Sequence, residues 1–320
     1  MLRWEKLGRI FDPREHDLPD GCTEYAQYPH PLVFQDFVRI YFSARRRDPR
    51  DGDRWFSHVC FVDMDKALRT VLRVSSQTVI ELGRLGCFDE HGIFPMYVLR
   101  SGSRIYGYTC GISRRASVAA DCSIGFTVSD DDGVTFQRLG NGPILTASLH
   151  EPFLVADPYV KQFEDRFHMW YVYGIEWKQY APEAPPDRIY KIGHAVSEDG
   201  ISWQKEGRQL LEDRFPEESQ ANPAVICFDG KYHMLFCYRQ SFDFRTNRER
   251  SYRIGYAHSD DLVNWIRDDA SVGIDVTEGT WDSDMLCYPD VFEVDGQIYL
   301  LYNGNEFGRH GFGLARLTRV

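Results

Sequence analysis

The sequence predicts an all-β protein with the fold of a five-bladed β-propeller, built from four-stranded antiparallel blades. The first observation is a short pattern that returns five times in 320 residues: a proline, an apolar stretch, a polar turn and an aromatic-rich strand. A second strand pattern follows most copies, and no segment has the apolar spacing of a long amphipathic helix. The prolines that open the copies lie 66, 63, 65 and 66 residues apart, at Pro29, Pro95, Pro158, Pro223 and Pro289.

The first pattern predicts two antiparallel strands in each copy. In every copy a polar turn separates two strings of aromatic and aliphatic residues, which is the pattern of a β-hairpin. The copies read YPHPLVFQDFVRIYFS from Tyr28, FPMYVLRSGSRIYGYT from Phe94, DPYVKQFEDRFHMWYVY from Asp157, NPAVICFDGKYHMLFCY from Asn222 and YPDVFEVDGQIYLLYNG from Tyr288.

The second pattern predicts a third strand, an acidic turn and a fourth strand. It begins at Ile124, Ile192 and Ile254, with degenerate forms near 57 and 312. Four strands repeated five times predict one propeller domain over 1–320, because radial repetition leaves only short sheet edges exposed. We expect WEKLGRIF near the amino end to pair with FGLARLTRV at the carboxy end and close the ring. The blades are anchored near 28–65, 94–145, 157–211, 222–269 and 288–317.

Several features have competing interpretations. Two β-sandwiches are an alternative fold, which the unbroken repeat disfavours. The acidic turns at 129–136, 197–203 and 259–265 are interpreted as structural turns, in which aspartates accept backbone N–H groups, over calcium loops. The first turn also fits the Asp-box of six-bladed sialidases, but the chain has five repeats and no evident trio of axial arginines. The longest expected loop is 174–190, whose three prolines exclude a regular strand or helix interior.

The charge balance and the cysteines limit the function classes. The formal net charge is −11, which opposes nucleic acid and anionic membranes as partners. No window approaches 18 consecutive apolar residues, and the amino end lacks a signal-peptide pattern, so we expect a cytoplasmic protein. The eight cysteines have wide, irregular spacing without a CxxC pair and are interpreted as reduced core thiols. We expect no metal and no cofactor, and the sequence leaves the oligomeric state open.

The candidate site lies at one end of the propeller axis. The first strand of each blade lines the axis, so residues beside the five prolines should converge there. Carboxylates from different blades around one funnel are what glycoside cleavage requires, since one acid protonates the leaving oxygen while a second serves water or the anomeric carbon. The candidate catalytic residues are Glu90, Glu151, Glu218 and Asp284. The candidate substrate-binding residues are His30, His91, Asp157, Asn222, Arg239, Trp281, Asp290, Asn303 and Asn305. Each also has a structural interpretation, as a strand end, a turn or a core residue.

The five-fold repeat, together with four longer strings, resembles the five-bladed propeller glycosidases. These include invertases, arabinanases, β-xylosidases and mannoside phosphorylases, and the resemblance covers essentially the whole chain. The strings are similar to a group of predicted glycosidase-like proteins found with bacterial surface-polysaccharide genes: FDEHGIFP (88–95), YRIGYAHSDDLVNW (252–265), WDSDMLCYPDV (281–291) and LYNGNEFGRHGFGLA (301–315). The acidic triad of arabinanase-like members is not reproduced, because blade one has His30 beside its proline and blade two has Met96.

These observations predict a carbohydrate-active enzyme that acts on a glycosidic or sugar-phosphate bond. The expected ligand is a small carbohydrate or a nucleotide-activated sugar, and hydrolysis, phosphorolysis and transfer all stay open. The alternative is a non-catalytic propeller that binds a sugar or a protein. The two hypotheses differ in geometry. Two carboxyls in one cavity about 5 to 5.5 Å apart indicate a retaining enzyme, and about 6.5 to 9.5 Å apart an inverting one, whereas carboxylates bound to arginines indicate binding or structure.

Overall fold

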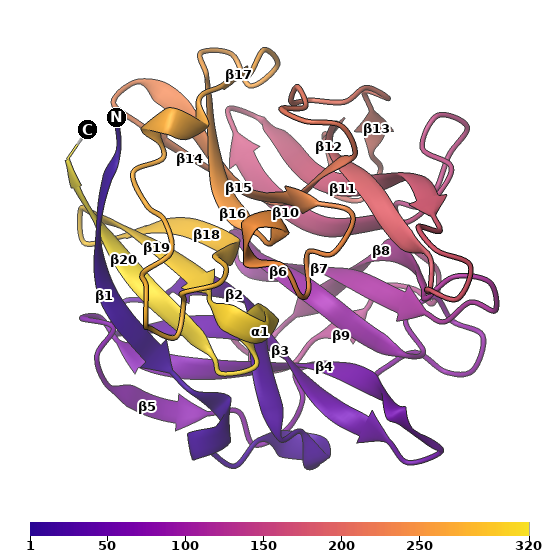
Figure 1. Ribbon diagram of the computed structural model, residues 1–320. Helices are drawn as coiled ribbons and strands as arrows, with labels where there is room; N and C mark the ends of the chain where they lie inside the picture. The colour runs from indigo at the N-terminus through magenta and orange to yellow at the C-terminus, as the bar shows by residue number, and fades with distance from the viewer. Residues whose placement is uncertain (320) are drawn as a thin grey trace.

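The computed structural model describes residues 1–319 and shows an almost entirely β architecture (Figure 1). Among these residues the only α-helix is the four-residue α1 (Asn305–Gly308). Four short 3₁₀ segments accompany it, at Pro13–Glu15, Pro19–Gly21, Arg248–Arg250 and Asp269–Ser271. No helix within this range is long and apolar enough to cross a membrane.

The strands form antiparallel units of four, numbered here in chain order. Unit 1 holds β2 (Glu24–Val33), β3 (Phe37–Asp48), β4 (Asp51–Asp65) and β5 (Val71–Val74), and unit 2 holds β6 (Gly92–Ser101), β7 (Arg104–Ser113), β8 (Asp121–Ser129) and β9 (Gln137–Arg138). Unit 3 holds β10 (Val155–Phe163), β11 (Arg166–Lys178), β12 (Asp187–Ser197) and β13 (Gln204–Lys205). Unit 4 holds β14 (Glu218–Phe228), β15 (Lys231–Gln240), β16 (Arg253–Ser259) and β17 (Ile266–Arg267). Unit 5 holds β18 (Cys287–Val294), β19 (Gln297–Asn303), β20 (Phe312–Arg319) and β1 (Arg3–Phe11).

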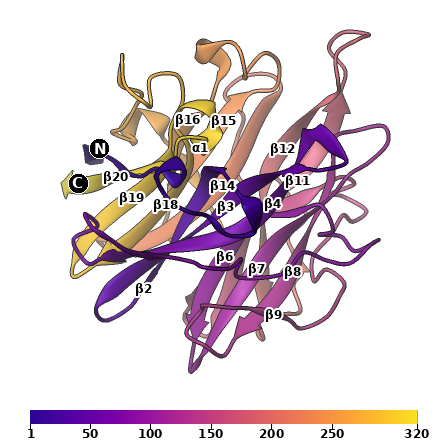
Figure 2. The ribbon, with the colours of Figure 1, turned by 90° about the horizontal axis from the view of Figure 1, so that it is seen from below.

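Units 1 and 2 belong to one eight-stranded sheet, but only a single parallel residue pair, Ser57 with Gly92, joins them. The first strands of the units contact one another in a closed cycle, from β2 to β6, β10, β14 and β18 and back to β2. Figure 1 shows β2, β6, β10 and β18 gathered near the middle, and Figure 2 shows the strands from the side. The predicted hairpins and antiparallel four-stranded repeats are therefore confirmed.

The two ends of the chain meet in unit 5. β1 pairs with β20 in antiparallel register, with Trp4 opposite Leu317 and Lys6 opposite Ala315. This confirms the expected pairing of the amino-terminal and carboxy-terminal segments, while Val320 lies outside the described residues. Figure 1 shows the two termini side by side.

Aromatic side chains connect neighbouring units. The hydroxyl of Tyr41 in unit 1 donates to the carbonyl of Gly133 in unit 2 over 2.8 Å. Tyr108 of unit 2 donates to Gly200 of unit 3 over 3.0 Å, and Tyr159 of unit 3 donates to unit 4 at the carbonyl of Val225 over 3.1 Å. Since a buried hydroxyl needs a partner, these repeated bonds set the spacing between units. Trp203 and Trp265 pack against the hydrophobic core that these units share.

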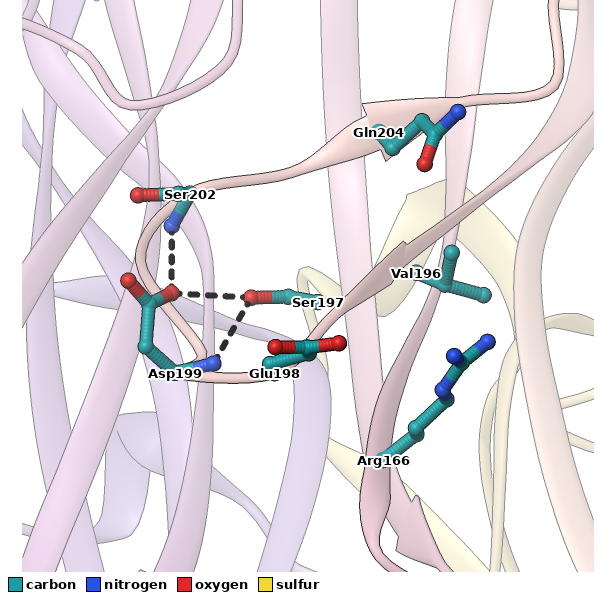
Figure 3. A pocket seen from close by; sticks show the side chains of 7 residues that line it. All are labelled: Arg166, Val196, Ser197, Glu198, Asp199, Ser202 and Gln204. Carbon is teal, nitrogen blue, oxygen red and sulfur yellow. Dashed lines mark hydrogen bonds between the residues drawn. The ribbon is translucent and has the colours of Figure 1, made fainter.

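The acidic turns are structural, as the sequence predicts. Asp199 accepts the backbone N–H groups of Ile201 and Ser202, and its carboxylate bonds the hydroxyl of Ser197 (Figure 3). Asp131 and Asp261 occupy equivalent turns and accept backbone N–H groups in the same way. The pocket of Figure 3, between Arg166 on β11 and the β12–β13 turn, is therefore bordered by a carboxylate already engaged by its own turn.

The expected loop at 174–190 is shorter than predicted. Residues 174–178 continue β11 and residues 187–190 begin β12, and the two strands stay paired out to Lys178 opposite Asp187. The prolines are confined to the connecting segment 179–186, so their exclusion from strands is right but the boundaries of the loop are wrong. Of the cysteines, which are all free thiols, five are buried, whereas Cys227 is exposed.

Candidate active site

A β-bulge interrupts every first strand at its X–Pro step. The pairing register of β2, β6, β10, β14 and β18 shifts at this step. The residue before the proline has a left-handed backbone in four units, with φ of 54° at Tyr28, 48° at Asp157, 51° at Asn222 and 55° at Tyr288. Such φ values are uncommon for residues with side chains, and bulges often re-aim a side chain beside a functional site.

The pre-proline side chains meet at a cavity of about 100 Å³, called here the axial cavity. Tyr28, Phe94, Asp157 and Tyr288 line it from four first strands. The third strand of unit 3 adds Arg188 and Tyr190 to this lining, and Tyr252 approaches from just before β16. The prediction that residues beside the prolines converge is therefore correct for these positions.

Asp157 is the one carboxyl among the described residues that lines the axial cavity. Its side chain accepts a hydrogen bond of 2.7 Å from the hydroxyl of Tyr28, and only 7% of the residue is exposed. Burial raises the pKa of Asp157 to about 6, although the hydrogen bond from Tyr28 and the charge of Arg188 act in the opposite direction. A carboxyl with such a pKa both holds and releases a proton near neutral pH, as a general acid or base requires.

Arg239 lies behind the tyrosines of the cavity wall. It is 1% exposed, and its Nε donates to the hydroxyls of Tyr190 and Tyr252 over 3.2 and 3.3 Å. Its guanidinium stacks over Phe244 at 3.6 Å, and Asp187 lies 3.7 Å from Nη2. Arg239 therefore positions two tyrosine hydroxyls at the cavity and does not itself line it.

Two larger pockets flank the axial cavity. The first lobe, of about 500 Å³, is bordered by Trp55, His91, Arg114 and the loop prolines Pro185 and Pro186, and it shares Ile112 with the axial cavity. The second lobe, of about 400 Å³, is bordered by Tyr25, Phe244, Asp284 and Phe307. The rings of Phe244 and Phe307 pack against Tyr252 of the axial cavity. Together these pockets are large enough for an oligosaccharide-sized ligand.

The sequence-predicted carboxylates do not surround one cavity. Glu151 is 1% exposed and is held by the hydroxyl of Tyr171 at 2.6 Å and by Lys205. Glu218 is fully buried, and Arg267 binds both of its oxygens over 2.7 and 3.0 Å. In each pair the acid lies before or at the start of the first strand, and the base lies on the fourth strand of the same unit.

The same pairing recurs in two more units and defines a repeated latch. Asp89 pairs with Arg138 of β9, and Asp282 pairs with Lys6 of β1. The four acids are at most 2% exposed, so each pair is a buried connection between the innermost and outermost parts of its unit. This placement corrects the expectation that Glu151 and Glu218 face the funnel.

The remaining two catalytic candidates lie apart from each other. Glu90 accepts the backbone N–H of Gly86 and lies 3.4 Å from the ring of His91. His91 lines the first lobe and stacks on Phe56, and burial together with Arg114 lowers its pKa. Asp284 has an exposed side chain at the edge of the second lobe.

His30 and Asp290, each directly after its proline, face each other on the other side of the pre-proline layer. The Nδ1 of His30 lies 2.6 Å from the Asp290 carboxylate, and its Nε2 donates to the carbonyl of Val98 over 2.7 Å. Both residues are almost fully buried, and the His30 ring packs on Tyr97. Through the carbonyl of Val98 the pair joins three units, and neither of its members lines the axial cavity.

The other binding candidates divide between the axis and unit 5. Asn222 occupies a pre-proline position and its Oδ1 has no hydrogen-bond partner among the described residues. Asn303 is fully buried and accepts the backbone N–H of Tyr28, while Asn305 accepts the backbone N–H of Asp284. The Trp281 ring packs against Tyr302. Asn303, Asn305 and Trp281 therefore shape unit 5 and the bulge at Tyr28, and they do not line the axial cavity.

Sequence reasoning missed the aromatic and basic side chains of the cavity, namely Tyr28, Phe94, Arg188, Tyr190 and Tyr252. The sequence nevertheless holds a signal that identifies some of these residues. The residue directly before the anchoring proline lines the axial cavity in four of the five units, whereas the residue directly after it does not. Regular strand alternation would put residues two positions apart on the same face, so the bulge at the X–Pro step is what separates them. Comparing the same offset in all five copies would have identified Tyr28 and Phe94.

Comparisons with known proteins give relatives that match the full length of the chain and relatives that match part of it. The chain is 33% identical over 319 residues to "Uncharacterized protein MT1551" of Mycobacterium tuberculosis (strain CDC 1551 / Oshkosh), covering 99% of each chain. It is 30% identical over 136 residues to a β-1,2-mannobiose phosphorylase of Thermoanaerobacter sp. (strain X514), covering 40% of this chain and 43% of the other. No protein-family model matches the chain.

Among solved structures, one described as a glycoside hydrolase superposes with a TM-score of 0.76. It is 18% identical in sequence, and the match covers 98% of this chain and 92% of that one. At this identity the likeness establishes the fold.

Proposed function

We propose that the chain, which belongs to one family with its full-length mycobacterial relative, is a carbohydrate-active enzyme of the five-bladed β-propeller glycosidase-like superfamily. The partial identity to a mannobiose phosphorylase supports a sugar ligand in the axial cavity and its lobes. We take 1–320 as one domain of five blades, which the cyclic contacts of the first strands support.

The position and environment of Asp157 carry the proposal. Its carboxyl faces the cavity in which the pre-proline residues of different units meet, and it holds a proton up to about pH 6. In the proposed step, protonated Asp157 donates its proton to the bridging oxygen of a glycosidic or sugar-phosphate bond, and that oxygen leaves as the hydroxyl of the departing group. Water or phosphate then adds to the sugar carbon as the acceptor, and the proton that it loses returns to Asp157. Arg188 stabilises negative charge that develops on the departing oxygen.

The single carboxyl also distinguishes this site from glycosidases that place two carboxyls about 5 to 9.5 Å apart. This observation favours, as a second candidate, a propeller that binds a small carbohydrate without cleaving it.

The free thiols of all eight cysteines support a cytoplasmic location, because disulfides persist in oxidising compartments. Hexoses, disaccharides and nucleotide-activated sugars are the ligands to examine.

The test is turnover of synthetic glycosides, disaccharides and sugar phosphates, with and without inorganic phosphate, by wild-type protein and Asp157→Asn. Loss of a general acid should lower kcat/KM about 10²- to 10⁴-fold. Asp165→Asn is the matched control, because Asp165 is exposed at the opposite end of the same hairpin. Full activity in Asp157→Asn would contradict the proposed role. Binding of a sugar without turnover under any condition would favour the binding protein.

A further inference from the structure

We propose that the axial cavity binds the oxyanion group of an acidic sugar, a carboxylate or a phosphoryl group carried by the substrate, through Arg45 and Arg188. The inference rests on the proposed function, because it assigns a substrate class to the same site. It begins from an imbalance of charge: the chain has a formal net charge of −11, yet neither Arg45 nor Arg188 forms an ion pair within 4 Å among the described residues. The acids whose charges act on them, Glu24 and Asp187, pair with Arg309 and Arg245 instead.

Arg45 lies between the axial cavity and the second lobe. Its guanidinium stacks 4.5 Å from the ring of Tyr25 and 5.7 Å from the ring of Phe94, which line the second lobe and the axial cavity respectively. Its Nε is buried without a hydrogen-bond partner in residues 1–319. Burial lowers the pKa of Arg45, and the charge of Arg188 lowers it further.

Arg188 lines the axial cavity directly, and its guanidinium lies 5.8 Å from the ring of Trp177. Its charge reaches both Asp157 and Arg45. Asp157 accepts the hydroxyl of Tyr28, and when it carries a proton it offers no negative charge to either arginine. Since Glu24 and Asp187 are paired with other arginines, the two half-buried cations leave the cavity with an excess of positive charge.

The arginines of the two lobes behave differently. In the first lobe Arg54 pairs with Asp51 at 3.1 Å and Arg114 with Asp48 at 2.6 Å. In the second lobe Arg245 pairs with Asp187 at 2.7 Å. The arginines of the lobes are thus neutralised by carboxylates, whereas Arg45 and Arg188, half-buried beside the axial cavity, form no ion pair among the described residues, and an unpaired charge that is partly desolvated is costly. A ligand anion supplies the missing charge, and a planar guanidinium suits carboxylate and phosphoryl oxygens.

The sizes of the pockets place this anion on the sugar. The axial cavity of about 100 Å³ is small for a ligand site and accommodates a charged substituent. The lobes of about 500 and 400 Å³ accommodate the sugar rings. A substrate that enters with its acidic group foremost brings its adjacent ring carbons to Asp157.

The experiment compares ligand affinity by isothermal titration at constant ionic strength. The probes are glucuronate, galacturonate, mannose 1-phosphate, the neutral methyl glycosides of the same hexoses, and inorganic phosphate. We expect at least one acidic sugar to bind at least 10-fold more tightly than its neutral counterpart. Arg45→Met and Arg188→Met should each weaken that binding at least 10-fold, and Arg104→Met, at an exposed site on the far turn of unit 2, should leave it unchanged. The uronates and the sugar phosphate distinguish the two sources of the anion.

A second readout requires no ligand. Removing an uncompensated buried charge relieves its desolvation cost, so Arg188→Met should raise the Tm of the free protein while it weakens the complex. Equal affinity for acidic and neutral sugars would overturn the anion proposal and leave the proposed function standing. Binding of inorganic phosphate alone would overturn the assignment of the anion to the sugar. Failure of every sugar to bind, together with a lowered Tm in Arg188→Met, would contradict both proposals.

Discussion

Replacing Glu218 with glutamine should lower the free energy of unfolding by about 3 kcal/mol without changing the chemistry of the axial cavity. Glu218 is fully buried, and the side chain of Arg267 is 6% exposed. Arg267 donates to both carboxylate oxygens over 2.7 and 3.0 Å, and the backbone N–H of Arg214 donates to one of them over 2.7 Å. The substitution removes the negative charge and leaves one amide group facing donors.

The magnitude follows from the partners that remain. Removing one member of a buried ion pair costs about 3 to 5 kcal/mol, because the other charge stays buried. Here Arg267 keeps Asp269 at 2.9 Å, so the low end of that range applies. With about 2.1 cal/mol/K of unfolding entropy per residue, a chain of 320 residues has about 0.7 kcal/mol/K in total, and 3 kcal/mol lowers Tm by about 4 to 5 °C.

The assay is urea and thermal denaturation of wild type, Glu218→Gln, Arg267→Met and the double variant. The double variant removes both charges, so we expect it to be more stable than the sum of the single effects predicts. Turnover or sugar binding measured below the transition should match wild type. Unchanged stability in Glu218→Gln combined with lost activity would refute this reasoning and return Glu218 to a catalytic role.

Three further predictions concern buried polar groups. Burial raises the pKa of Asp157 from 3.8 to about 6, so the folded state binds more protons between these values and loses stability as pH rises through 6. Asp157→Asn should therefore be up to about 3 kcal/mol more stable than wild type at pH 7.5 and no more stable at pH 4; equal stability at both pH values would contradict this. Burial lowers the pKa of His58 from 6.5 to about 4, so this residue should contribute a loss of about 3 kcal/mol, relative to His58→Leu, as pH falls from 6.5 to 4. His58→Leu should flatten that dependence in urea denaturation, and a parallel curve would count against it. Asn303→Ala removes three hydrogen bonds of 2.8 to 3.0 Å and should cost about 3 kcal/mol in thermal denaturation, while an unchanged Tm would show that these bonds are replaced.

The fold was predictable because the same pattern of strands and turns occurs five times in the sequence. Turn residues such as Asp229-Gly230 and Asp295-Gly296 adopt the positive φ that hairpin turns need, and strand alternation then follows. The pairing of β1 with β20 was predictable because unit 5 lacks a strand that the amino end supplies. The continuation of β11 through residues 174–178 was not predictable, because the local sequence of a long hairpin does not differ from that of a loop before the first proline.

The candidate site was less predictable, because the sequence shows which residues are acidic and not which way they point. Glu151 precedes its first strand by a few residues, as an axial carboxylate would, but Lys205, 54 positions later, draws it into the latch of unit 3. Such pairing depends on contacts between distant segments. Asp157 was identified as a binding residue because it adjoins a proline, but its raised pKa arises from burial, which only the folded chain provides.

The repeat itself separates structural from functional residues. A side-chain type that recurs at nearly the same place in several units serves what the units share, as the acids of the latch do five to seven residues before the prolines of units 2 to 5. At the pre-proline offset the units instead differ: aromatic at 28, 94 and 288, acidic at 157 and amide at 222. Since the bulge imposes nearly the same backbone on four of these positions, local folding does not require the difference. A buried carboxyl at one of five equivalent positions lowers stability at neutral pH, and its presence is explained if the reaction needs its proton.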